Sequence, residues 1–305
     1  MGRAVLGYIP KTQISKAQGK ERHYLFQEEI QAGVEEERVS RAVGFWQQGA
    51  WTRWENTLQH RISRLNIMQA DFHHVLFLVQ AVYDVLPSPA NLHAWGKNET
   101  PTCLLCSRRG SLEHLLSSCP KALADGCYWW RHDRVLKAVA ESIALAISTS
   151  KHHHAKKKVI TFIKAGDKSQ ARPRTTTGLL HTASDWQLQV DLGRQLKFPQ
   201  HIAETSLCPD MVITSAASKQ LIMLELTVPW EESMEETNER KHAKYQVLLE
   251  MCRGRGWRMS YEPIEVGCRG FAVCSLCRAL SRLGISGMAK KMAIQSATEA
   301  TEKIT

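Results

Sequence analysis

The sequence contains no long apolar run, no secretory signal and no lipidation signal. Its most apolar stretch, residues 75–82, is far shorter than the roughly 18 residues that a membrane-spanning helix needs. Residues 1–20 lack the apolar segment of a secretory signal, and Leu6 stands where N-myristoylation requires Ser or Thr. We therefore expect a chain that is not secreted and does not span a membrane, located in the nucleus or the cytoplasm.

Complete disulfide pairing is also excluded, because the chain has nine cysteines, an odd number. Without a secretory signal, such cysteines are typically reduced thiols and candidates for metal binding. Acidic residues are the scarcer charge: 30 Asp and Glu stand against 40 Lys and Arg, which gives a net charge of +10. This balance favours an anionic partner, most simply DNA, with RNA as a further candidate.

The 305 residues are enough for about two domains. Residues 1–34 are polar and weakly periodic, so we expect them to be poorly ordered. Residues 35–147 have the apolar spacing of helices and include a cysteine-rich segment at 101–120. The basic, histidine-rich stretch at 148–158 predicts a solvated linker, with contact to phosphates or to a metal as the alternative.

Two apolar stripes mark the helical region. One consists of Trp46, Trp54 and Leu58, and the other of Phe72, Leu76, Val79 and Tyr83. Aromatic side chains at this spacing can stack on bases, but a packed core is the more common explanation. We therefore expect the stripes to be buried.

The second half of the chain predicts an α/β domain over residues 159–268 and C-terminal helices over 269–305. The expected elements are a strand at 159–163, a helix at 184–196, a strand, turn and strand at 211–229, a helix ending near 252 and a strand at 257–267. Two helices, at 272–283 and 287–302, close the chain. The sequence thus predicts the α+β class, with a helical N-terminal region before a domain with a mixed sheet.

Four residues with metal-ligand spacing lie in the cysteine-rich segment. Cys103, Cys106, His114 and Cys119 form a C-x2-C-x7-H-x4-C array. Two close ligands, a loop and two further ligands allow one short segment to surround a tetrahedral ion. Because protein fills all four positions, the array predicts a structural Zn²⁺ site in a small zinc knuckle, with Cys127 as a less favoured ligand.

Asp210 and Glu225 flank a predicted β-hairpin. The residues between them are apolar and β-rich, except for a small polar turn. If the turn centres between Ala217 and Ser218, the two acids lie directly opposite each other, about 5 Å apart, where like charges are destabilising. A divalent cation with a preference for oxygen ligands reverses that effect. The pair therefore predicts an Mg²⁺ site, and a nuclease is the obvious user of it.

Phosphodiester hydrolysis at such a site benefits from a lysine near the attacking water or the scissile phosphate. In the common arrangement this lysine stands two residues after the second acid, where the chain has Thr227. Lys241 and Lys244 share one face of the following helix and are the candidate replacements. Lys241 ranks first because it is nearer the start of that helix, and a surface role is the alternative for each lysine. Glu204 is a candidate for a further carboxylate.

Basic residues dominate the stretch from 251 to 291, which holds eight Arg or Lys and two acids. As phosphate contacts they would give salt-dependent affinity for DNA without sequence preference. We expect a DNA-facing surface from the arginines of this stretch, namely Arg253, Arg255, Arg258, Arg269, Arg278 and Arg282.

Taken together, these motifs resemble the C-terminal region of non-LTR retrotransposon polyproteins that carry a restriction-like endonuclease. The likeness rests on the Cys/His array followed by Pro209-Asp210 and by the run Glu-Leu-Thr-Val-Pro-Trp-Glu at 225–231, and on segments 86–92, 130–136 and 264–271. It implies a PD-(D/E)xK nuclease fold, dependence on Mg²⁺ and nicking of target DNA. It also implies that the catalytic lysine comes from the helix.

Two departures from the family pattern narrow the prediction. Cys208 stands where the family usually has Arg or Lys, and the sequence contains no adjacent pair of aspartates, so the chain is not a reverse transcriptase. We expect a DNA endonuclease tail of such an element, without the polymerase. The alternative is a catalytically inactive, nucleic-acid-binding remnant with a zinc knuckle. A weaker third hypothesis is an interaction protein that uses its helical N-terminal half.

Overall fold

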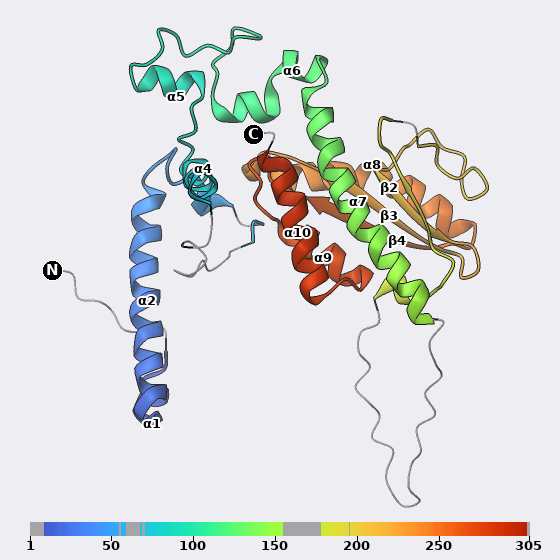
Figure 1. Cartoon of the computed structure of the whole chain (residues 1–305), viewed down its shortest axis with the longest axis horizontal. Coiled ribbons are helices and arrows are strands. Elements are labelled where there is room, and N and C mark those ends of the chain that lie inside the picture. The colour runs from blue at the N-terminus through green and yellow to red at the C-terminus, as the bar shows by residue number, and fades with distance from the viewer. Residues whose placement is uncertain are drawn as a thin grey trace, which may run out of the picture. The chain divides into compact units, whose positions relative to one another are not determined.

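The computed structural model describes residues 9–54, 56–58, 68, 71–154, 178–194 and 196–303 (Figure 1). They fall into two compact units, one within residues 1–55 and 62–87 and the other within 56–61 and 88–305. The predicted strand at 159–163 and residues 155–158 of the predicted linker lie outside the described residues.

The first unit is helical, which confirms the predicted helical N-terminal region. It contains α1 (Lys11–Lys16), α2 (Gly19–Val43), the short 3-10 helix η1 (Ala50–Arg53) and α4 (Phe72–Val82). Asp71 caps α4, because its side chain accepts a hydrogen bond from the backbone N–H of His74 at 3.1 Å.

Helix α2 begins earlier than its composition predicts. Residues 19–34, expected to be poorly ordered, form more than half of it. The Glu, Gln, Lys and Arg that make this stretch polar are also strong helix formers. Pairs one turn apart add to this further along the helix, such as Arg38 with Glu35 at 2.6 Å. Polarity here indicates a solvated helix rather than the absence of structure.

The apolar stripe of α4 is exposed, so the prediction that it is core is wrong. Phe72 is 71% exposed, and Leu76, Val79 and Tyr83 are exposed as well. Trp46 is 84% exposed, whereas Trp54 is buried. The helical spacing identified the helix but carries no information about what covers its apolar face.

The second unit is built on a four-stranded mixed sheet, as the sequence predicts for its α+β class. Strands β1 (Gln187–Val190), β2 (Met211–Ser215), β3 (Gln220–Thr227) and β4 (Arg258–Glu265) follow one another in sheet order. The first three are antiparallel neighbours, and β4 runs parallel to β3. The parallel pair requires a crossover connection, which α8 (Met234–Gly254) supplies.

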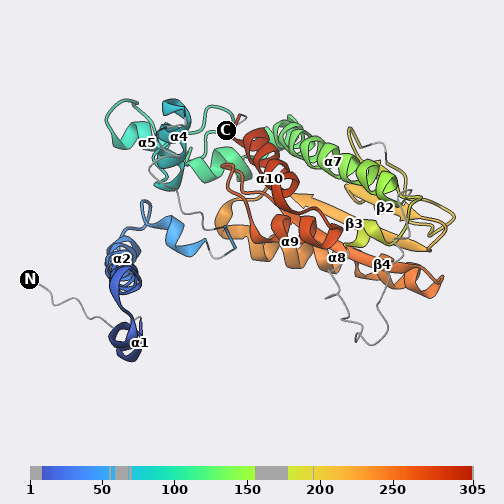
Figure 2. The ribbon, with the colours of Figure 1, turned by 60° about the horizontal axis from the view of Figure 1, so that its bottom comes forward.

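Helices cover both faces of this sheet. Helix α7 (Cys127–His154) passes in front of the sheet in Figure 1 and α8 lies behind it, and Figure 2 shows the sheet between them. Successive strand side chains point to opposite faces. Ile222 and Leu224 therefore share a core with α7, α9 (Cys274–Leu283) and α10 (Gly287–Glu302), whereas Leu221 and Met223 pack against α8.

Before α7, the chain forms α5 (Pro89–Ala94), the π-helical turn η2 (His114–Ser118) and α6 (Pro120–Ala124). Helix α7 continues to His154, so residues 148–154 of the predicted linker are helical. Because α7, α9 and α10 share one core, the second unit extends across the predicted boundaries at 147/148 and 268/269. None of the described helices is both long and apolar enough to cross a membrane.

The helix predicted at 184–196 is absent from the described part of that range, and β1 takes its place. The apolar residues Trp186, Leu188 and Val190 alternate with Gln187 and Gln189, which is the period of a strand rather than of a helix. Strand β1 has only four residues and lies at the edge of the sheet, where strands are often short.

Candidate functional site

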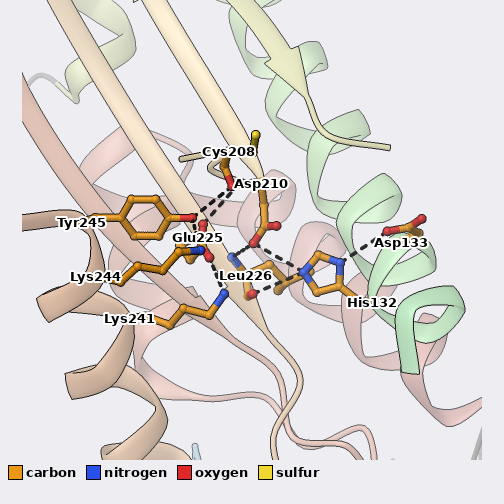
Figure 3. Close-up of polar contacts among 9 residues, drawn as sticks. All are labelled: His132, Asp133, Cys208, Asp210, Glu225, Leu226, Lys241, Lys244 and Tyr245. Carbon is orange, nitrogen blue, oxygen red and sulfur yellow. Dashed lines mark hydrogen bonds and ion pairs between the residues drawn. The ribbon is translucent and has the colours of Figure 1, made fainter. Parts of the chain in front are cut away.

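Asp210 and Glu225 meet at the open end of the β2–β3 hairpin, as the sequence predicts. The register pairs Met211 with Leu224, and one more step along the hairpin sets Asp210 opposite Glu225. The backbone N–H of Asp210 donates to Glu225 Oε2 at 3.2 Å, and that of Leu226 donates to Asp210 Oδ2 at 2.7 Å (Figure 3). The hairpin backbone therefore fixes both carboxylates.

This acid pair lies in an environment that disfavours two negative charges. The Glu225 side chain is 2% exposed. Burial raises its pKa, and the nearby charge of Asp210 raises it further, while Lys241 opposes both effects. The buried carboxylate of Glu225 and the half-buried carboxylate of Asp210 need a cationic neighbour to remain ionised together.

Lys241 on α8 supplies one positive charge directly. Its Nζ forms an ion pair with Glu225 Oε1, and the lysine side chain is 25% exposed. Lys244 points into the same group from the next turn of α8, but its Nζ donates to the Tyr245 hydroxyl at 3.0 Å (Figure 3). That hydroxyl donates in turn to the carbonyl of Cys208, also at 3.0 Å. The structure thus brings Lys241 to the acids and Lys244 to their flank.

His132 on α7 completes the group, and sequence reasoning missed its role. Its Nε2 lies 3.4 Å from Asp210 Oδ2 and 3.3 Å from the Leu226 carbonyl, and its Nδ1 lies 3.4 Å from Asp133 Oδ1 (Figure 3). All three partners are acceptors, so both ring nitrogens are best satisfied when protonated. Burial alone lowers the His132 pKa, but the hydrogen bond and the charge of Asp210 outweigh it and raise the pKa.

Thr227 occupies the usual lysine position and does not replace the lysine. Its Oγ1 is buried and has no hydrogen-bond partner among the described residues. In the register it pairs with Glu265 on β4, whose Oε1 is likewise unpartnered. Burial raises the pKa of Glu265, and hydrogen bonds with Ser275 and Asn238 oppose that effect. Sequence reasoning missed Glu265, because only the parallel β3–β4 pairing brings it to this face.

Glu265 borders a polar cavity with a volume of about 250 Å³. The cavity is lined by residues of the first turns of α8 and α9, among them Glu235, Asn238 and Ser275. Glu204, the predicted further carboxylate, is exposed in the segment before β2. The described residues show no polar contact between Glu204 and either acid, so the structure does not bring it into the site.

The four Cys and His residues of the array come together as a second cluster. Their ligand atoms all lie within 4.8 Å of one another. Cys103 Sγ lies 4.0 Å from Cys119 Sγ, and Cys106 Sγ lies 3.1 Å from His114 Nε2. Tetrahedral zinc with bonds of about 2.3 Å to sulfur sets sulfur atoms about 3.8 Å apart. The cluster can therefore hold a metal ion, and its geometry is compatible with a structural zinc.

A tight backbone turn creates this cluster, and α7 anchors it. The N–H of Cys103 donates to the carbonyl of Arg108 at 2.6 Å, which folds Cys106 back toward Cys103. The hydroxyl of Tyr128 on α7 accepts from the N–H of Cys119 at 2.9 Å and donates to the carbonyl of Leu115 at 3.1 Å. Cys127, the less favoured ligand, is exposed and is not part of the cluster.

The basic stretch at 251–291 does not form the uniform surface that its composition predicts. Arg269 is fully buried, with its Nε 2.7 Å from Glu231 Oε2. Arg282 pairs with Glu262 at 3.2 Å. Arg255 and Arg258 donate to backbone carbonyls. Several of these arginines therefore have structural partners, which composition cannot reveal.

Comparison of the chain with protein-family models gives no match, and no curated protein matches it. The function of the chain therefore has to be inferred from its residues and their arrangement.

Proposed function

We propose that this chain is a Mg²⁺-dependent DNA endonuclease of the restriction-like, PD-(D/E)xK type, similar to the C-terminal region of non-LTR retrotransposon polyproteins. The observation that carries the proposal is the opposition of Asp210 and Glu225 on a buried hairpin, with Lys241 reaching Glu225 from α8. Two carboxylates can hold a metal ion that activates water, and a lysine beside them can stabilise the developing phosphate charge.

Each residue has a distinct role in this proposal. Asp210 and Glu225 would hold Mg²⁺, which when bound supplies charge neutralisation at the phosphate and an activated water. Lys241 stabilises the negative charge that develops on the phosphate and orients the water. His132 fixes the side chain of Asp210 through their 3.4 Å contact. Lys244 holds Tyr245 and, through it, the Cys208 backbone beside the acids.

The residues fit a hard divalent cation on electrostatic grounds. Burial and the Asp210 charge raise the pKa of Glu225 even with Lys241 present, so the pair still lacks positive charge. Carboxylate oxygens are preferred ligands of Mg²⁺. A bound cation between them would lower the electrostatic cost of keeping both groups ionised.

The Cys/His cluster would serve a different purpose in the same protein. With protein ligands at all four positions, a bound Zn²⁺ would be structural rather than catalytic. Its anchoring to α7 by Tyr128 links this zinc knuckle to the helix that carries His132. The net charge of +10 supports DNA as the partner.

The proposal is tested by nicking of supercoiled plasmid DNA with purified full-length protein and Mg²⁺. The wild type should convert supercoiled DNA to the open-circular form, and Asp210→Ala should not. Glu250→Ala, which removes an exposed carboxylate near the end of α8, is the matched control for loss of one negative charge and should cleave normally. Absence of Mg²⁺-dependent nicking by the wild type would contradict the enzyme proposal.

Cys208 favours a second candidate, an inactive nucleic-acid-binding remnant. It is an exposed residue directly before Pro209-Asp210, where the resembled family usually has a basic side chain. A remnant would bind DNA with salt-dependent affinity but would not cleave it. Retained binding without nicking, under conditions in which Cys208→Arg restores nicking, would identify loss of the basic side chain as the cause.

A further inference from the structure

Trp129 on α7 is a large aromatic residue that the proposed chemistry does not use. It is 45% exposed, and the guanidinium of Arg194 lies over its ring at 3.3 Å from the centroid. Arg194 is itself exposed. An exposed pair of this kind contributes little to a hydrophobic core, so core packing does not explain why the two side chains lie together.

Two separate connections place this pair beside the acids. Trp129 precedes His132 by three residues on α7, and side chains at this spacing share a helix face about 5–6 Å apart. His132 contacts Asp210. Arg194 lies in the β1–β2 connection, and the N–H of Asp191 in that connection donates to the carbonyl of Asp210 at 2.8 Å.

The connection holds Arg194 in an unusual conformation. Gly193 and Arg194 have φ values of +74° and +57°, and a positive φ is uncommon for a residue other than glycine. The Asp191 side chain closes the loop by accepting from the N–H of Leu196 at 2.8 Å. Such backbone strain persists where the surrounding structure imposes it, and it clusters at functional sites.

An aromatic ring with an arginine over one of its faces offers a π surface and a positive charge together. Bases stack on aromatic rings and on guanidinium planes with little dependence on sequence. Stacking of this kind requires an unpaired base, because paired bases are covered by their neighbours in the duplex. The chemistry of the pair therefore fits a single-stranded nucleotide better than a duplex.

We propose that Trp129 and Arg194 form a stacking site for an unpaired base of the DNA strand that flanks the scissile phosphate. This inference rests on the proposed nuclease function for its position, and it adds a preference for DNA that is locally single-stranded. Arg194 contributes its charge to the adjacent phosphate.

The test measures binding of a fluorescent DNA duplex with a single-stranded tail to the full chain, without added Mg²⁺. Trp129→Ala should weaken binding about tenfold, as expected for one stacked base. Trp129→Phe should retain most of the affinity. Arg194→Ala should weaken binding and reduce the slope of its salt dependence by about one phosphate contact.

Trp130→Ala is the matched control. Trp130 is the next residue of α7, is 56% exposed and also has an arginine over its ring, Arg134 at 5.7 Å, but it points about 100° away around the helix. It should bind within about twofold of the wild type, since no stacked base is lost. Equal loss in both tryptophan variants, or no loss in either, overturns the proposal.

An abasic position moved along the tail locates the stacked base. One position should weaken wild-type binding as much as Trp129→Ala does, and combining the two changes should cause no further loss. Additive losses at every position overturn the proposal. Nicking of the same DNA with Mg²⁺ separates the nuclease proposal from the stacking proposal. Failed nicking together with a position-specific abasic effect contradicts only the nuclease. Normal nicking together with unchanged binding by Trp129→Ala contradicts only the stacking site.

Discussion

The Cys/His cluster takes all its ligands from residues 103–119. The acidic site, which consists of Asp210 and Glu225 with Lys241 and His132, takes its residues from α7, from the β2–β3 hairpin and from α8. All four Cys and His side chains of the cluster come from this one segment, and the hydroxyl of Tyr128 on α7 supports it from outside. The acidic site exists only when the sheet has the correct register and both helix layers are packed. The Cys/His cluster therefore depends mainly on one segment, whereas the acidic site depends on the whole fold of its unit.

Removing a cluster ligand is expected to have the largest effect, and that effect should stay local. In Cys106→Ser, zinc content should fall well below one ion per chain, because structural zinc binding is worth about 10–16 kcal/mol and needs all its ligands. Elemental analysis measures the metal, and hydrogen exchange should increase over residues 103–119 while the amides of β2 and β3 remain protected.

Cys127→Ser is the control for this change, since Cys127 is an exposed cysteine outside the cluster. It should retain its zinc and its exchange protection. If Cys106→Ser instead unfolds the sheet, the cluster is not a local module and the rest of the fold depends on it.

The second largest effect is expected in the acidic site. Asp210→Ala should lower the rate of DNA nicking by about 1,000-fold or more, since loss of a metal ligand removes several kcal/mol of transition-state stabilisation. The fold should survive, because Glu225 keeps its ion pair with Lys241 and loses a neighbour of like charge. Single-turnover nicking and thermal unfolding measure the two effects, and a matching fall in the unfolding temperature would point to structural damage instead.

Lys241 and Lys244 of α8 occupy different positions within the acidic site, so their variants can be compared. Lys241→Met should reduce nicking by about 100-fold, in the range of a single electrostatic group, because Lys241 contacts Glu225. Lys244→Met should reduce it only severalfold, because Lys244 acts through the Tyr245 hydroxyl. Equal losses, measured as single-turnover rates at saturating Mg²⁺, would remove the distinction that the geometry draws between them.

The same contrast explains how much of the molecule the sequence could predict. The array of Cys103 to Cys119 was evident from spacing alone, and the polar turn at Ala217 and Ser218 fixed the hairpin register that sets Asp210 opposite Glu225. Both are local signals. The edge strand β1 is hard to predict because its alternation covers few residues. Residues 19–34 of α2 are polar, which predicts poor order, although the same residue types favour helix.

Residues that depend on tertiary packing could not be predicted in this way. His132 reaches Asp210 only because α7 packs across the sheet. Glu265 lies opposite Thr227 only through the parallel pairing of β4 with β3. The exposed stripe of α4 could not be predicted either, because the spacing of its residues defines an apolar face but not what packs against that face.

A smaller effect than that of Lys241→Met is expected at His132, whose role is to position Asp210. His132→Ala should raise the Mg²⁺ concentration needed for half-maximal nicking by about tenfold, as for other residues that orient a metal ligand, and should change the rate at saturating Mg²⁺ much less. His132→Asn keeps a donor toward Asp210 and should lie between the alanine variant and the wild type. Asp133→Ala, which removes only the partner of the other ring nitrogen, should stay close to the wild type. A purely structural role would lower the rate and the unfolding temperature together and leave the Mg²⁺ dependence unchanged, so the Mg²⁺ titration decides whether α7 belongs to the acidic site or only supports the sheet beneath it.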